Sequence, residues 1–272
     1  MLGSFADAED MLQETYIRWQ EAADDEIDNP RAYLLTIISR LCINHLQSAR
    51  VRREEYFGQW LPEPLIALDG SDPLGLVELD ETLSMAFLVL LERLTPVERA
   101  TFLLREVFDY DYAEISALIG ENEANCRQIL RRARQHVSAE RRRFRSTPEK
   151  QSDLLQRFLK ATAEGDLAGL VSMLADDVVL YADGGGKGLA VPNRIDGSDK
   201  VARSVVGAMG KLVPKNLVRR IVQVNRMPGV VSYLDGKPFS VIALAGSEQI
   251  QAIYLVTNPD KLAHIAPLEP LQ

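Results

Sequence analysis

Residues 109–137 read DYDYAEISALIGENEANCRQILRRARQHV. Asp111 and Glu114 form a capping box that opens a short helix, and Gly120 ends that helix. A second helix starts at Asn122. Its apolar positions recur at i, i+4, i+7 and i+11, the spacing of a buried stripe, and are Cys126, Leu130, Ala133 and Val137. Two short helices joined at a glycine predict a helix-turn-helix.

The opposite face of this second helix is polar and basic. It carries Asn122, Asn125, Arg127, Gln128, Arg131, Arg132 and Arg134, and the run RRRFR follows at 141–145. Asparagine, glutamine and arginine pair with base edges, while further arginines neutralise phosphates. An arginine-rich solvated helix is the alternative interpretation. The glycine turn, the capped helices and the basic tail together favour DNA binding.

Further helices precede this motif. Residues 7–23 show a helical apolar stripe with an acidic opposite face, and Asn29-Pro30 marks the start of a helix whose far end is polar and basic up to Arg53. A helical pattern covers 79–92, and a capping box at Thr95–Glu98 opens another helix. The first half of the chain is therefore predicted to be all-α.

The sequence pattern changes at two points along the chain. Residues 54–76 are rich in proline and glycine and lack periodicity, which predicts a linker. After Pro148 come predicted helices at 153–163, 167–174 and 200–209, and predicted strands at 178–181, 217–224, 230–234, 240–245 and 249–256. Helices followed by a run of strands predict an α+β domain.

Composition narrows the function classes. The 272 residues suit two or three modules, and the net charge is −8. Residues 1–30 hold nine acids and one arginine, whereas 121–146 hold eight arginines and three glutamates, so two different partners are indicated.

Cysteine and histidine usage adds further limits. Cys42 and Cys126 lie far apart in helical patterns, which fits a reducing cytoplasm without disulfides. His45, His136 and His264 are too scattered for a metal site, and we expect no cofactor. No apolar run is long enough for a membrane span.

Several motifs carry a family resemblance. They are DAEDMLQET at 7–15, NPRAYL at 29–34, WLPEPL at 60–65, LTPVERA at 94–100 and DGGGK at 183–187. Together they resemble the extracytoplasmic-function sigma factors that carry a fused SnoaL-like (NTF2-like) domain. The resemblance implies two all-α modules, sigma-2 and a helix-turn-helix sigma-4, followed by an α+β cone with a curved mixed sheet.

The implied boundaries are a sigma-2 module at 1–55, a linker at 56–77, a sigma-4 module at 78–146 and a SnoaL-like domain at 150–272. The family normally has one more helix ahead of Met1, and residues 1–4 look like the end of that helix. The sigma-2 module is therefore expected to be short at its N-terminus.

The resemblance also implies promoter-specific transcription initiation, with core RNA polymerase and promoter DNA as partners. Polymerase contacts are implied at Asp7, Glu9, Asp10, Gln13 and Glu14. Minus-10 contacts are implied at Asn44, Arg50, Arg52 and Arg53, and minus-35 contacts at Asn122, Asn125, Arg127, Gln128, Arg131 and Arg132.

The C-terminal domain permits two interpretations. Tyr181, Asp183 and His264 are candidate acids or bases, but no spacing singles out a pair. DGGGK lacks the glycine spacing of a P-loop and is either a flexible turn or a docking loop. The resemblance favours docking, with a regulatory set of Trp60, Pro62, Glu63, Pro64, Asp183, Gly184, Gly185, Gly186 and Lys187.

We therefore expect a fused regulator that is not an enzyme, with a small-molecule ligand in the C-terminal cavity as a further possible partner and no membrane partner. Two alternatives stay open. In one, the C-terminal domain binds or turns over a small molecule to which the sigma modules respond. In the other, the chain is a plain DNA-binding regulator without a polymerase contact, which would leave the acidic helix at 7–23 unexplained.

Overall fold

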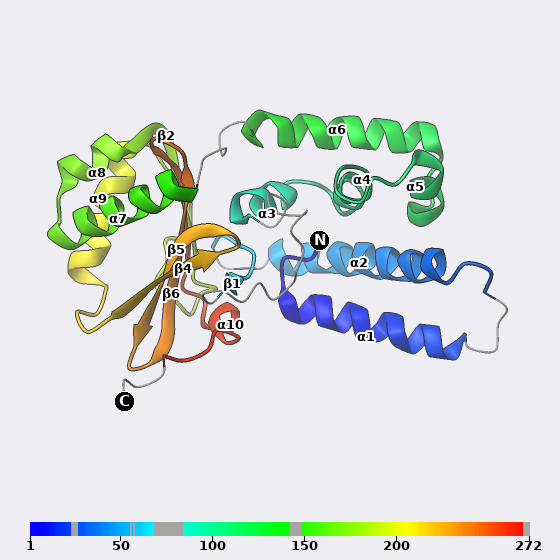
Figure 1. The fold of residues 1–272 in the computed structure, drawn as a ribbon, viewed down its shortest axis with the longest axis horizontal. Helices are drawn as coiled ribbons and strands as arrows, with labels where there is room; N and C mark the ends of the chain where they lie inside the picture. Colours follow the sequence, from blue (N-terminus) through cyan, green and yellow to red (C-terminus); the bar gives the residue numbers. More distant parts are fainter. Residues whose placement is uncertain (23–26, 55, 57, 68–83, 142–147, 269–272) are drawn as a thin grey trace. The chain divides into compact units, whose positions relative to one another are not determined.

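The structure is a computed structural model that describes residues 1–22, 27–54, 56, 58–67, 84–141 and 148–268. Within these ranges, residues 49–54, 67, 138–141 and 148–149 are described by their backbone alone. The chain divides into two compact units (Figure 1). One comprises Met1–Glu55 and Val89–Ala139, and the other comprises Tyr56–Leu88 and Glu140–Gln272.

The first unit is helical. Its elements, with α3 at the boundary between units, are α1 (Phe5–Glu21), α2 (Pro30–Glu54), α3 (Met85–Leu91), α4 (Pro96–Glu106), α5 (Tyr112–Ile119) and α6 (Glu123–Arg141). Helix α1 begins after Ser4, whose hydroxyl accepts a hydrogen bond from the Asp7 N–H. Helix α2 begins after Asn29, whose side chain accepts from the Ala32 N–H at 3.0 Å. Both starts agree with the predicted helices to within two residues.

The helix-turn-helix is confirmed in detail. Both predicted capping boxes form, Thr95 with Glu98 and Asp111 with Glu114. Gly120 ends α5 in the left-handed region at φ +76, and a side chain there would meet nothing within 4 Å. Glycine is therefore favoured at this turn by its backbone conformation rather than by lack of space.

A small apolar core holds α4, α5 and α6 together. The predicted inward positions of α6, namely Cys126, Leu130, Ala133 and Val137, are all buried. Cys126 packs with Leu104, Ile115 and Leu118, and Leu35 of α2 lies against the same cluster. The burial of this stripe sends the polar face of α6 outward.

The second unit is built on a mixed sheet. Its helices are α7 (Pro148–Glu164), α8 (Leu167–Met173), α9 (Ser198–Lys211) and α10 (Pro259–Leu262). Its strands are β1 (Ile66–Ala67), β2 (Leu174–Asp183), β3 (Ile195–Asp196), β4 (Val218–Val224), β5 (Met227–Leu234), β6 (Lys237–Gly246) and β7 (Ile250–Val256). Among the described residues the strand order is β1-β4-β5-β6-β7-β2-β3.

Strands β4 to β7 form an antiparallel meander, and β2 joins it parallel to β7. The sheet stays open, with β1 and β3 at its edges. Helices α7, α8 and α9 cover one face (Figure 1), where Phe158, Leu170 and Val201 pack against Leu180 and Ile253. This is the α+β architecture with a mixed sheet that the sequence predicts.

Strand β1 was not predicted, because it lies in the segment that reads as a linker. Ile66 pairs with Val224 and Ala67 with Gln223, so the linker adds a short antiparallel strand to the C-terminal sheet. None of the described helices is long and apolar enough to cross a bilayer. Within the described ranges, no three His, Cys, Asp or Glu side chains come together as a metal site would require.

Candidate functional site: a docked linker and an arginine-rich helix

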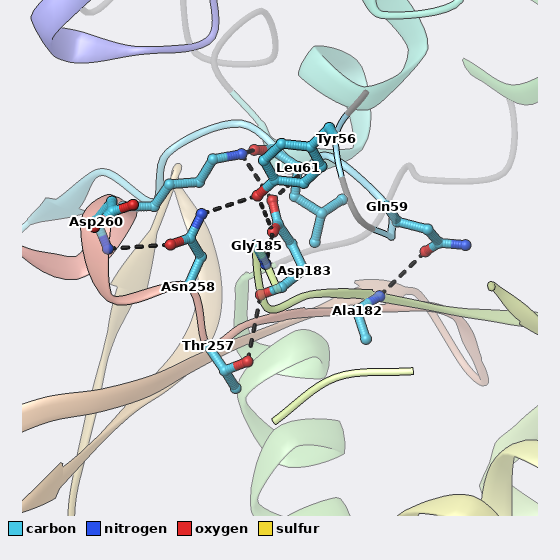
Figure 2. A network of polar contacts seen from close by, with 10 residues as sticks. Tyr56, Gln59, Leu61, Ala182, Asp183, Gly185, Thr257, Asn258 and Asp260 are labelled. Atoms are coloured by element: carbon cyan, nitrogen blue, oxygen red, sulfur yellow. Dashed lines mark hydrogen bonds and ion pairs between the residues drawn. The ribbon is translucent and has the colours of Figure 1, made fainter. Parts of the chain in front are cut away.

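Asp183 lies at the end of β2 and its side chain is fully buried. Four donors meet its two carboxylate oxygens, and Figure 2 labels Tyr56, Leu61 and Gly185 among them. Oδ1 accepts from the Tyr56 hydroxyl at 2.5 Å and from the Gly185 N–H at 3.1 Å. Oδ2 accepts from the Leu61 N–H at 2.8 Å and from Lys261 Nζ at 2.7 Å. These donors compensate a buried charge that would otherwise be costly.

Lys261 is the cation of this site. It lies on α10, is also buried, and donates a second hydrogen bond to the Leu61 carbonyl. Its ammonium is 3.9 Å from the centre of the Trp60 ring, within the range of a cation–π contact. Leu61 is thus held at both backbone groups, by Asp183 at its N–H and by Lys261 at its carbonyl. We call Asp183, Lys261, Asn258, Tyr56 and Leu61 the Asp183 network.

Tyr56 and Asn258 complete the network. Asn258 Nδ2 donates to the Tyr56 hydroxyl at 2.8 Å, and its Oδ1 accepts from the Asp260 N–H that opens α10. Burial raises the pKa of the Tyr56 phenol above its ordinary range, and the Asp183 carboxylate raises it further. Tyr56 is therefore protonated at neutral pH and donates its proton to Asp183.

The remainder of the linker is docked as well. Gln59 Oε1 accepts from the Ala182 N–H at 3.2 Å, close to Asp183 (Figure 2). Leu65 exchanges two hydrogen bonds with Asn225, at 3.1 Å to the side chain and 2.7 Å from the backbone N–H. The Pro64 carbonyl lies 2.9 Å from His264 Nε2. Polar contacts from β2, the β4–β5 turn and α10 thus follow the linker from Tyr56 to Leu65.

The predicted regulatory residues divide into two groups. Asp183 and Trp60 make the contacts above, and the linker residues Pro62 and Pro64 are buried while Glu63 is half-buried. Gly185 has φ +58, and a Cβ there would lie 2.4 Å from Asn258 Nδ2, so the loop reaches Asn258 only with glycine. In the same loop Gly184 is buried and Gly186 is exposed.

Lys187 lies apart from the linker contacts. It is exposed and pairs with Asp260 at 2.6 Å. An ion pair this exposed contributes little to stability.

The sequence does not predict the partners of Asp183 and the linker. No motif marks the residues that make these contacts, which are Tyr56, Gln59, Asn225, Asn258 and Lys261, and the sequence presents His264 only as a candidate acid or base. Asn258-Pro259 has the form of a helix start, an N-cap followed by proline at N1, and that signal would have placed α10. Contacts that join residues about 200 positions apart leave no local pattern.

The three candidate acids and bases have other partners. Tyr181 stacks on Tyr254 with ring centroids 5.5 Å apart and an interplanar angle of 11°. Asp183 accepts from four donors, and His264 is exposed beside the Pro64 carbonyl. Two of the three thus contact the linker, which favours docking over general acid–base chemistry.

The outer face of α6 presents the predicted minus-35 residues. Asn122 caps the helix by accepting from the Asn125 N–H, and Asn125 Nδ2 donates to Glu121. Arg127 pairs with Glu123 at 2.7 Å. Gln128, Arg131 and Arg132 are exposed and form no hydrogen bond or ion pair with the residues that the structure describes.

The predicted minus-10 and polymerase residues lie on α2 and α1. Asn44 is exposed on α2, whereas the side chains of Arg50, Arg52 and Arg53 lie outside those described, as does the run at 141–145. On α1, Asp7 lies 3.3 Å from His45, and Glu14 pairs with Arg18 at 2.8 Å. The remaining acidic and polar positions of this set are exposed and are Glu9, Asp10 and Gln13.

Known proteins resemble this chain along nearly all of it. The family described as Sigma-70 region 2 matches residues 1–52, and Sigma-70, region 4 matches residues 84–137. The chain is 36% identical to the ECF RNA polymerase sigma factor SigJ of Mycobacterium tuberculosis, covering 96% of this chain and 87% of that protein. It is 30% identical to the probable ECF RNA polymerase sigma factor SigI of the same species, covering 96% and 88%.

The crystal structure of M. tuberculosis SigJ is similar to this fold, with a TM-score of 0.75 at 33% identity. The similarity covers 98% of this chain and 93% of that one. Both helical regions and the C-terminal sheet domain therefore have a counterpart in a solved relative. The chain belongs to the extracytoplasmic-function RNA polymerase sigma factors, which direct promoter-specific transcription initiation.

Proposed function

We propose that the C-terminal domain regulates transcription initiation by holding the linker in a docked state. The observation that carries the proposal is the Asp183 network, in which a buried carboxylate and a buried ammonium bind both backbone groups of Leu61. The linker follows α2 in the sequence and precedes α3 and α4. Docking it restrains the segment that joins the minus-10 and minus-35 parts of the factor.

The regulation requires two states, one with the linker docked and one with it released. The docked linker buries Leu61, Pro62 and Pro64 and satisfies the polar groups around them. A linker in this state is not available to the polymerase, so release favours the active holoenzyme. A small molecule that binds only the domain with its linker released would shift the same equilibrium.

The DNA contacts follow from α6 and α2. We assign minus-35 recognition to the exposed face of α6, with Gln128, Arg131 and Arg132 presented to the groove and Arg127 beside them. Minus-10 contacts fall to Asn44 and to the arginines that end α2.

The acidic face of α1 is assigned to core polymerase. Exposed apolar side chains of the same helix, Phe5, Leu12, Tyr16 and Ile17, extend the surface available for that contact.

Run-off transcription with core RNA polymerase tests the regulatory proposal. Asp183→Asn removes the charge of the network at nearly constant size, and we expect several-fold more transcript than from the wild type. Lys187→Ala is the matched control, because Lys187 belongs to the same loop and pairs only at the surface with Asp260. Equal transcription by all three proteins would refute a regulatory role, and a loss in Asp183→Asn would show that docking is required for activity.

We infer that the C-terminal domain works by docking and not by catalysis. Asp183, the buried carboxylate among the candidate acids and bases, has its oxygens occupied by the linker, Gly185 and Lys261. A factor that acts on RNA polymerase and promoter DNA works in the cytoplasm. Detecting turnover of a small molecule by the purified chain, abolished in Asp183→Asn, would overturn the non-enzymatic assignment.

A further inference from the structure

Tyr112 is the first residue of α5, and its ring links the helix-turn-helix core to two arginines. The ring is partly buried and packs against the apolar cluster that contains Ile115 and Cys126. The guanidinium carbon of Arg127 lies over the ring at 4.7 Å from its centre, and that of Arg105 lies over it at 5.5 Å. Tyr112 therefore offers a fixed aromatic surface on which two cations rest.

The two arginines differ in what else they contact. Arg105 binds the loop before α5, because its Nη1 donates to the Tyr110 carbonyl at 2.7 Å and lies 3.5 Å from the Asp109 carboxylate. Arg127 is more exposed and has one carboxylate partner among the described residues, Glu123 at 2.7 Å. Glu123 sits one turn earlier on the same helix, so the pair does not tie Arg127 to another element.

The position of Arg127 over the Tyr112 ring suits a side chain that must meet DNA. A guanidinium attracted to the face of an aromatic ring does not use up its N–H groups as hydrogen-bond donors, so they stay available for a base or a phosphate. A long side chain that is ordered before binding also loses less entropy when the complex forms. Tyr112 supplies such ordering from α5, and it does so from outside the recognition helix.

We propose that Tyr112 is a positioning residue for minus-35 recognition and that it holds Arg127 in the orientation that meets the DNA. This inference rests on the proposed function, which places the outer face of α6 at the minus-35 element. Tyr112 acts through Arg127, and its hydroxyl is not required. Glu123 is the competing partner that the DNA displaces when Arg127 binds.

A double-mutant cycle tests the proposal. Full-length chain assembled with core polymerase is titrated onto a labelled promoter fragment, using wild type, Tyr112→Leu, Arg127→Ala and the double variant. We expect Tyr112→Leu to weaken binding about two- to fivefold, the range of an exposed cation–π contact. Tyr112→Phe keeps the ring and should bind as the wild type does. In the Arg127→Ala background, Tyr112→Leu should cost nothing further.

Two outcomes overturn the positioning role. Losses that multiply in the double variant would show that Tyr112 acts independently of Arg127, as a general loss of fold also would. Equal weakening by Tyr112→Phe and Tyr112→Leu would assign the role to the hydroxyl instead. Thermal unfolding of each variant, followed by circular dichroism, shows whether the fold is retained.

The same titration separates this inference from the proposed function. If Arg131→Ala and Arg132→Ala weaken binding while Arg127→Ala does not, the positioning role fails and α6 remains the DNA-reading helix. If none of the three substitutions changes the affinity, α6 does not read the minus-35 element and the proposed function fails at that point.

Discussion

Replacing Asp183 by asparagine tests the docked linker most directly. Four donors converge on the two carboxylate oxygens, and an asparagine offers only one oxygen. Its amide NH₂ must then face at least one donor. The substitution also leaves the buried Lys261 ammonium without its counter-charge, while the size of the side chain is nearly unchanged.

The free-energy cost of Asp183→Asn follows from the burial of the Asp183–Lys261 ion pair. The side chain of Asp183 is 0% exposed and that of Lys261 is 8% exposed. Removing one partner of a buried ion pair costs about 3–5 kcal/mol, because the remaining charge stays desolvated. The protein can avoid this cost by releasing the linker and hydrating Lys261. We therefore expect the loss to appear as linker release and not as unfolding of the sheet domain.

Hydrogen exchange provides the assay, because the Leu61 N–H is donated to Asp183 itself. A loss of about 3–5 kcal/mol in docking corresponds to exchange of this amide that is faster by about 150- to 4,000-fold. The amides of β6 and β7 should keep their protection. Lys187→Ala is the control and should leave the Leu61 amide unchanged, since the Lys187–Asp260 pair is exposed.

A second substitution tests whether the buried charges of Asp183 and Lys261 are coupled. Lys261→Met in the Asp183→Asn background removes the stranded ammonium, so protection of the Leu61 amide should partly return. If the double variant exchanges as fast as the product of the two single effects, the pair is not coupled and the argument from the buried charge is wrong. Unchanged exchange in Asp183→Asn alone would show that the network does not hold the linker.

Three further predictions concern other parts of the chain. Because the pKa of Tyr56 is raised in the docked state, the stabilisation that its hydroxyl gives to docking is complete below about pH 10, the value for a free phenol. It is lost as the pH rises above that value, and a Tyr56→Phe variant should lack this pH dependence of Leu61 exchange. Gly120→Ala should destabilise the helical unit by about 1–2 kcal/mol in urea unfolding, because Gly120 is left-handed at φ +76. Arg131→Ala or Arg132→Ala should weaken promoter binding and lower the slope of log affinity against log salt by about 1 if the arginine contacts a phosphate.

The sequence pattern predicts the strands that are long enough to show it. The predicted strand at 217–224 is β4 at Val218–Val224, and that at 249–256 is β7 at Ile250–Val256. Both are seven-residue runs rich in β-branched side chains, a composition and length that predict a strand. Strands β1 and β3 have two residues each and α10 has four, so no period can identify them.

The site was predictable only in part. Asp183 and the segment from Trp60 to Leu65 stand out as motifs, but nothing in either motif names the other as its partner. Lys261 lies 78 positions from Asp183 and 200 from Leu61, and such pairings arise from the order of the strands in the sheet. On α6 the sequence identified the outer face, but it did not show that Glu123 and Tyr112 hold Arg127.

The chemistry of the docking surface suits a linker that must detach. If docking rested mainly on large apolar side chains, release would expose them to water at about 25 cal/mol for each Å², and the docked state would dominate. In the Asp183 network the Leu61 side chain is buried. The other groups that release exposes are a carboxylate, an ammonium, a phenol and backbone amides, which water solvates well. A buried ion pair contributes less net stability than its geometry suggests, because both charges lose their hydration when the linker docks. The docked and released states are then separated by a few kcal/mol, which binding to core polymerase can overcome.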